Sequence, residues 1–297
     1  MIQEDIKLKK LKTHVNYILR KDFYDNRVVK SCPICGGSHY IKNGLYKGIQ
    51  RYKCKECNKT FSKATDSLWS YSKKNPEIWL EFIELMLEKK SLRFCAKKLK
   101  ISLVTAFFWR HKVLHALSLD GTQDSLEGIV HITKTILKEN FKGCRNIEFD
   151  FTTQRRRNIW IVGAKGDEDS MFVKPVFREA WDWKTYYEKV YTKVEKKAYM
   201  VPYGDRYLEI AAKEHNKNRF LEVKDDDRIK YFTLNLENWL KVFRGVATKY
   251  LQRYLSFFVL YNLDKELDYV QIMLSNLLNG DRFIKTNKVR RIENYMY

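Results

Sequence analysis

The chain has 297 residues, of which 44% are hydrophobic and 14% aromatic, so it has enough apolar material for two or three folded domains and is not a disordered protein. No apolar run approaches the roughly 20 residues of a membrane span, and Met1–Arg20 is charged throughout, so we expect neither a membrane segment nor a signal peptide. The formal charge is +21, and residues 1–120 carry 25 Lys and Arg against 11 Asp and Glu, which indicates a polyanionic partner such as duplex DNA.

Residues 1–30 are predicted to form a short basic helix, because apolar residues recur at helical spacing among lysines. The chain has six cysteines, and four of them stand in metal-ligand spacing, which favours a reducing compartment over a disulfide framework. We therefore expect a location in a bacterial cytoplasm, associated with the nucleoid, or in a nucleus if the source is eukaryotic.

Residues 31–65 are predicted to form a zinc ribbon. Cys32 and Cys35 form one Cys-x-x-Cys pair, and after eighteen residues Cys54 and Cys57 form a second pair. Two such pairs allow four thiolates to converge tetrahedrally on one Zn²⁺, and a site with four protein ligands is structural.

Two strands are expected in the ribbon, at Tyr40–Tyr46 and Gln50–Lys53. The segment is rich in basic side chains, which are suited to contact phosphates. The candidate DNA contacts of the ribbon are Lys47, Arg51, Lys53, Lys55 and Lys59.

Residues 66–120 are predicted to form a helix-turn-helix DNA-binding domain. Pro76–Lys90 is an amphipathic helix, and two shorter helices are expected at Ser91–Leu99 and Leu103–Leu117, the latter capped by Ser102. Two short helices joined by a tight turn have the shape of a helix-turn-helix. We expect the last helix to bury Val104, Phe107 and Phe108. The side chains expected to be exposed there and to contact DNA are Thr105, Arg110 and Lys112.

Residues 121–263 change from helical to strand patterns and are predicted to form an RNase H-like α/β domain, followed by a C-terminal helical tail over residues 264–297. The fold class is therefore α+β with several domains. The order of elements is strand, hairpin, helix, strand, helix and long helix. The expected elements are Gly128–Ile136, Ile147–Phe151, Ile159–Ala164, Met171–Phe177, Ala180–Glu195, Ala198–Tyr203, Tyr207–His215, and Asn235–Leu260 apart from Gly245.

Four motifs, in this order along the chain, carry a resemblance to a known family. They are G-L-Y-K-G-I-Q-R-Y-K-C-K-E-C-N-K-T-F-S, W-R-H-K-V-L, G-I-V-H-I-T-K-T-I-L-K-E-N-F-K-G and F-R-G-V-A-T-K-Y-L-Q-R-Y-L. From Cys32 to about Phe258, the chain resembles bacterial insertion-sequence transposases of the ISXO-two-like group, which are related to the eukaryotic Merlin elements. The resemblance implies a zinc ribbon and helix-turn-helix that bind transposon ends, and an RNase H-like nuclease that uses two Mg²⁺ ions.

The resemblance also implies where metal ligands should stand, and this chain lacks them there. Family members read G-I-V-E-x-D-E-T on the first strand, whereas this chain has Thr133 at the Asp position and Lys134 beside it. The Asp of the fourth strand falls on Tyr203, or on Pro202 with a shift of one residue, and the third position, commonly Asn, falls on Lys230. Because a two-metal reaction needs converging carboxylates, we predict that the chain is catalytically inactive.

An alternative interpretation keeps the enzyme active through a displaced acidic set. Asp150, Asp205 and Glu237 would then hold Mg²⁺ for DNA cleavage and strand transfer. It requires Ile147–Phe151 to be the true first strand. Asp150 is better explained as an ion-pair partner of the arginine run that follows it, and that run can instead contact phosphate. The run consists of Arg155, Arg156 and Arg157.

The sequence therefore predicts a zinc-ribbon protein derived from a transposase that binds double-stranded DNA as a scaffold or regulator. A further hypothesis is a protein-interaction module, in which the former nuclease domain has become a binding surface. Interfaces favour Trp and Tyr, and a homo-oligomer or another protein would then be the partner. The aromatic residues suited to that use are Trp181, Trp183, Tyr186, Tyr187 and Tyr191.

Overall fold

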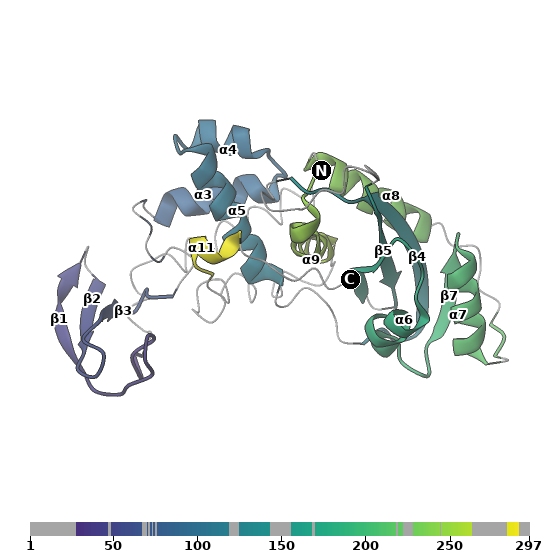
Figure 1. The fold of residues 1–297 in the computed structure, drawn as a ribbon, viewed down its shortest axis with the longest axis horizontal. Helices are drawn as coiled ribbons and strands as arrows, with labels where there is room; N and C mark the ends of the chain where they lie inside the picture. The colour runs from purple at the N-terminus through teal and green to yellow at the C-terminus, as the bar shows by residue number, and fades with distance from the viewer. Residues whose placement is uncertain are drawn as a thin grey trace. The chain divides into compact units, whose positions relative to one another are not determined.

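The computed structural model has two compact units, and the residues of one unit are described separately from those of the other (Figure 1). The first unit includes the described residues up to Ala116 and residues 284–290, and the second includes the described residues from Leu117 to Asn262. The described residues are 28–46, 49–66, 70, 72, 74, 76–118, 125–142, 156–167, 170–217, 219–221, 228–243, 245–262 and 284–290.

Three predicted elements lie largely or wholly outside the described residues. They are the helix over residues 1–30, the strand Ile147–Phe151 and most of the tail over residues 264–297. Within the described part, the tail contributes the short helix α11, Thr286–Val289. None of the described helices combines the length and the apolar character needed to cross a bilayer.

The cysteine-rich segment forms a three-stranded antiparallel sheet of β1 (Tyr40–Tyr46), β2 (Ile49–Cys54) and β3 (Thr60–Ser62), in the order β1-β2-β3. The first two strands confirm the prediction, whereas β3 was not predicted. One aromatic residue from each strand packs together, with ring centroids 5.4–5.6 Å apart. A sheet this small has little other core, which is typical of domains that a bound metal helps to stabilise.

Three helices follow in the first unit, as the sequence predicts: α3 (Pro76–Leu87), α4 (Leu92–Lys98) and α5 (Leu103–Ser118). Trp79 of α3 stacks on Trp109 of α5, with ring centroids 3.8 Å apart, and both side chains are buried. This contact ties the two long helices together.

The second unit is built on a four-stranded sheet. Its strands are β4 (Ile129–Lys138), β5 (Asn158–Lys165), β6 (Met171–Arg178) and β7 (Tyr199–Tyr203), in the order β6-β5-β4-β7. β5 pairs antiparallel with β4 and β6, which confirms the predicted hairpin, while β7 pairs parallel with β4.

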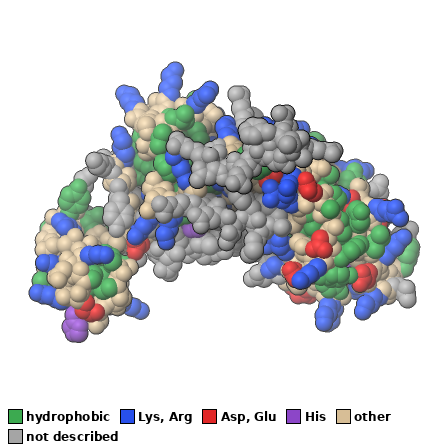
Figure 2. Space-filling view, viewed as in Figure 1, with side chains coloured by type: hydrophobic (Ala, Val, Ile, Leu, Met, Phe, Trp, Pro, Cys, Tyr) green, Lys and Arg blue, Asp and Glu red, His purple; other side chains and the backbone are tan. Residues whose placement is uncertain are grey.

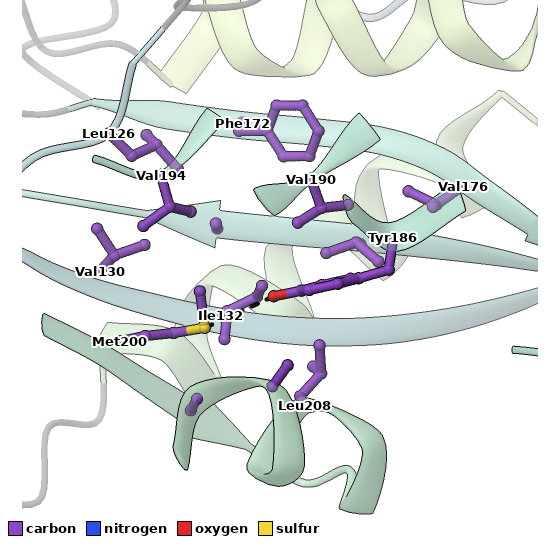
Figure 3. Packing of buried hydrophobic residues seen from close by; sticks show 14 of the residues in the cluster. Leu126, Val130, Ile132, Phe172, Val176, Tyr186, Val190, Val194, Met200 and Leu208 are labelled. Carbon is purple, nitrogen blue, oxygen red and sulfur yellow. Dashed lines mark hydrogen bonds between the residues drawn. The ribbon is translucent and has the colours of Figure 1, made fainter. Parts of the chain in front are cut away.

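Helices cover both faces of this sheet (Figure 1). On one face, α6 (Trp183–Lys189) and α7 (Arg206–Asn216) enclose a core in which Tyr186 donates a hydrogen bond to the Met200 sulfur at 3.7 Å (Figure 3). On the other face, α8 (Arg228–Val242) and α9 (Leu251–Asn262) pack, and Phe232 sits against Gly163 so closely that a Cβ there would lie 2.6 Å from the ring.

Two predicted helices differ from the structure. The predicted helix Ala180–Glu195 is only α6 followed by a 3₁₀ turn, Tyr191–Lys193. The predicted long helix over residues 235–260 is in fact α8 and α9, with Gly245 at φ +85° between them. That left-handed conformation suits glycine and ends a helix. The break therefore lies at Gly245, the residue excluded from the predicted helix.

The outer edge of β7 is closed by side chains instead of a fifth strand. Met200 donates its N–H to Asn216 Oδ1 and accepts from Asn216 Nδ2, both at 2.9 Å. The carbonyl of Ala198 lies 3.1 Å from His215 Nε2 and accepts from Arg219 at 3.0 Å, and Pro202 has no N–H to satisfy. These contacts satisfy backbone groups that an exposed edge would offer to another strand.

Candidate functional site

The four cysteines of the ribbon converge in space. Their Sγ atoms all lie within 4.8 Å of one another, with Cys32 and Cys57 3.8 Å apart and Cys35 and Cys54 3.6 Å apart. Tetrahedral Zn–S bonds of about 2.3 Å place sulfur atoms about 3.8 Å apart, so this donor set is compatible with a structural zinc site. Within the described part of the chain, these four cysteines are the one set of three or more His, Cys, Asp or Glu side chains that lie close enough to share a metal ion.

Two tight turns position these thiols. Gly36, at φ +80°, donates its N–H to the Cys32 carbonyl at 2.8 Å, and the Cys32 N–H donates to Gly37 at 2.8 Å. The second turn closes from the Cys54 N–H to the Lys59 carbonyl at 3.0 Å. Backbone N–H groups, chiefly that of Cys57, lower the pKa of the Cys54 thiol to about 7, whereas the neighbouring thiols raise the pKa of Cys35 to about 12. The thiols therefore share their protons, and Cys54 is the one that most readily becomes the thiolate that a metal binds.

Basic side chains of the ribbon are largely accessible, as a DNA-contacting surface requires. Lys55 and Lys59 are exposed, and Arg51 and Lys53 are partly exposed. Arg51 also donates a hydrogen bond to Thr60 at 3.1 Å. Lys47 lies outside the described residues.

The expected orientation of α5 is wrong. Arg110 is 3% exposed and Lys112 is 8% exposed, whereas Val104, expected in the core, is 56% exposed. Phe107 and Phe108 are partly exposed, and Thr105 is partly exposed with its hydroxyl 2.8 Å from that of Ser102.

Arg110 is buried because it has a structural partner. Its Nη2 donates to the Lys90 carbonyl, just after α3, at 2.5 Å. Burial also lowers the pKa of Lys112. Apolar residues occur on several sides of α5, so the sequence does not determine which face of the helix is buried. In the structure, Arg110 and Lys112 lie on the buried face.

Two of the three degenerate catalytic positions lie next to each other. Thr133 of β4 is the direct register partner of Tyr203 at the end of β7. Thr133 is 2% exposed, and its hydroxyl lies 3.3 Å from that of Thr233 on α8. Lys230 is exposed on the same helix, one turn before Thr233. The structure therefore brings strand β4, strand β7 and α8 to one place, although Thr233 was not foreseen.

Lys134 is engaged on the opposite face of the sheet. Its ammonium forms an ion pair with Asp205 and lies 3.8 Å from the ring centroid of Trp160. The Lys134 and Asp205 side chains are only 10% and 13% exposed. Asp205 also accepts from the N–H groups of Tyr207 and Leu208, which makes it the N-cap of α7. Asp205 therefore has two structural roles, as the ion-pair partner of Lys134 and as the N-cap of α7.

The other members of the displaced acidic set do not join Asp205. Glu237 pairs with Lys241 one turn later on α8, at 3.9 Å, and Asp150 lies outside the described residues. Neither Asp205 nor Glu237 belongs to a group of described acidic, histidine or cysteine side chains that could share an ion. The described part of the chain therefore provides no support for a displaced two-metal site.

Only some residues of the predicted arginine run and of the aromatic group are exposed and able to contact a partner. Arg157 forms an ion pair with Glu179 at 3.4 Å, Arg156 is exposed, and Arg155 lies outside the described residues. Of the aromatic residues, Tyr186 is buried in the core, and Trp181 stacks on Tyr207 with ring centroids 5.1 Å apart. The remaining three are partly buried against the same core: Trp183, Tyr187 and Tyr191.

Comparison with known proteins gives one informative likeness. The chain is 29% identical, over 113 residues, to an uncharacterized protein in transposable element ISH50 of Halobacterium salinarum. The match covers 38% of this chain and 38% of the relative, so the chain spans well under half of the length of that protein. No family model matches the chain, and no solved structure matches it. The likeness supports a protein related to insertion sequences without specifying the group.

Proposed function

We propose that this protein is a DNA-binding factor derived from an insertion-sequence transposase of the ISXO-two-like group, and that it does not cut DNA. The pairing of Thr133 with Tyr203, where the family carries carboxylates, is the observation that carries the proposal. The cysteine cluster and the net charge of +21 support retention of the DNA-binding half.

The sheet of the second unit supports an RNase H-like ancestry. Its central strand β4 is flanked by the antiparallel hairpin β5–β6 on one side and by the parallel strand β7 on the other. Helices follow β6 and β7, in the order expected for that fold. In open α/β sheets, sites form beyond the carboxyl ends of strands, which is where Tyr203 ends β7.

Helices α4 and α5 support a helix-turn-helix. The connection between them is four residues long, and Lys100 in it has φ +50°, the left-handed conformation that glycine often provides in such turns. Ser102 then accepts the Thr105 N–H at 3.0 Å as the N-cap of α5. Leu99 and Ile101 are buried beneath the turn.

The chemistry of the degenerate positions argues against metal-dependent cleavage. Mg²⁺ prefers carboxylate oxygens, and Thr133 and Tyr203 are neutral. Lys230 on α8, the third position, carries a positive charge in place of a metal-ligating oxygen. The nearest acid in the sequence, Asp205, is neutralised by Lys134 and used as a helix cap.

A binding titration tests the proposal. Fluorescence anisotropy of labelled duplex DNA should show binding in the presence of EDTA, because no divalent ion is required. Affinity should fall by at least about tenfold between about 50 and 200 mM salt, as expected when several phosphates are neutralised. Absence of duplex binding at low salt by the zinc-loaded full-length protein would contradict the proposal.

A further inference from the structure

One stretch of the chain is basic and has no acidic residue. Between Lys89 and Leu119 there are eight Lys and Arg and no Asp or Glu. This stretch contains all of α4 and α5. Arg110 and Lys112 are buried, so the remaining cations must produce the surface charge.

The cations of α4 and of the turn after it face solvent. Arg93, Lys97, Lys98 and Lys100 are all exposed, and Figure 2 shows blue side chains projecting from the surface over α4. Lys98 is bound by Glu81 of α3 at 3.8 Å, so it is partly neutralised. The other three are the cations best placed to meet phosphates.

Large apolar side chains are also exposed in the same stretch of the chain. Phe94 of α4 is 47% exposed, and Leu103 and Val104 in the first turn of α5 are 47% and 56% exposed. Leu103 and Val104 begin the second helix of the motif, the part of such a helix that reaches base edges when it enters the major groove.

We propose that this surface, consisting of Arg93, Phe94, Lys97, Lys100, Leu103 and Val104, binds the major groove of duplex DNA and recognises thymine methyl groups. The inference rests on the proposed DNA-binding function and specifies its site. Charge complementarity selects the partner, because the exposed cations Arg93, Lys97 and Lys100 match a phosphate backbone. Apolar side chains cannot read hydrogen-bonding edges, but they can contact the C5-methyl group that distinguishes thymine in the major groove.

Replacement of thymine by uracil in the DNA tests this directly. A thymine-rich duplex and the same duplex with deoxyuridine at every thymidine differ only in the methyl groups. For each methyl group that the protein buries, the full-length chain should bind the uracil duplex about fourfold more weakly. The triple variant Phe94→Ser/Leu103→Ser/Val104→Ser should bind the two duplexes equally, because it removes every apolar side chain of this surface. Leu234→Ala, an exposed leucine of α8 in the other unit, should retain the difference.

Charge variants separate the two parts of the surface. Arg93→Gln, Lys97→Gln and Lys100→Gln should each reduce the salt slope by about one unit and leave the thymine-to-uracil ratio unchanged. Salt-dependent binding with equal affinity for both duplexes would overturn this inference and leave the proposed function intact. A uracil effect that persists in the triple variant Phe94→Ser/Leu103→Ser/Val104→Ser would overturn the assignment of methyl recognition to this surface. Lack of any duplex binding would overturn the proposed function as well.

Discussion

Thr133 of β4 lies directly opposite Tyr203 of β7, in the parallel pair at one side of the sheet. The hydroxyl of Thr133 also lies 3.3 Å from that of Thr233 on α8. Thr133 is 2% exposed and therefore belongs to the core between β4 and α8, whereas Tyr203 is 37% exposed.

The Lys134–Asp205 ion pair should stabilise the second unit. Lys134→Met removes a charge from a pair that is only 10% and 13% exposed and leaves Asp205 without its cation. We expect a loss of about 3 kcal/mol in the free energy of unfolding, as for other largely buried pairs. Hydrogen exchange of the β4 amides, measured in the parent protein and in the variant at a series of denaturant concentrations, gives this loss of unfolding free energy.

The matched control for Lys134→Met is Lys241→Met. Lys241 pairs with Glu237 at 3.9 Å, but its side chain is 72% exposed, so the change should be within about 0.5 kcal/mol. Equal effects of the two substitutions would show that the Lys134 pair is not a buried structural element.

The edge cap of β7 should also be measurable. Asn216→Ala leaves the N–H and the carbonyl of Met200 without their partners, so we expect a loss of about 2–3 kcal/mol in the free energy of unfolding. The opened edge should also promote aggregation, which light scattering detects. Asn238→Ala, at an exposed position of α8, is the control and should change neither quantity.

Zinc removal should unfold the ribbon selectively. Each chain should bind one zinc ion, and chelation should expose the ribbon to protease while the second unit stays protected, because the metal supplies about 10–16 kcal/mol to such small sites. Cys54→Ser should lose the metal, whereas Cys95→Ser should keep it, since Cys95 is buried elsewhere. Full zinc content in Cys54→Ser would contradict the four-cysteine site.

The second unit should lose stability in mild acid. Burial lowers the pKa of His215, so the folded state prefers the neutral imidazole and the unfolded state binds more protons below about pH 6.5. The free energy of unfolding should therefore be constant above about pH 7 and fall as the pH drops through 6.5 towards 5. Denaturant titrations at a series of pH values measure this slope, and His215→Gln should reduce it. An unchanged slope in the variant would exclude His215 as its cause.

The sequence predicted the features that local patterns determine. The cysteine spacing identified the four thiols that cluster in space. Alternation of apolar residues located β4, and a hairpin pattern located β5 and β6, all within two residues at each end. The orientation of α5 was not predictable, because apolar residues surround it. Its inner face is revealed by tertiary contacts, those of Trp109 with Trp79 and of Arg110 with Lys90. The partners of Lys134 could not be predicted from the sequence either. Asp205 and Trp160 are far from Lys134 along the chain and are brought close to it by the pairing of β7 and β5 with β4.

Whether the protein cuts DNA is best decided by a cleavage assay on DNA that it demonstrably binds. Full-length zinc-loaded protein should be incubated with supercoiled plasmid and with linear duplex, in Mg²⁺ and separately in Mn²⁺, under conditions where anisotropy shows saturation. We predict binding without a nick or a strand-transfer product. Divalent-dependent nicking that is abolished by Asp205→Asn would contradict this prediction, because the acid assigned here to an ion pair and a helix cap would then be serving catalysis.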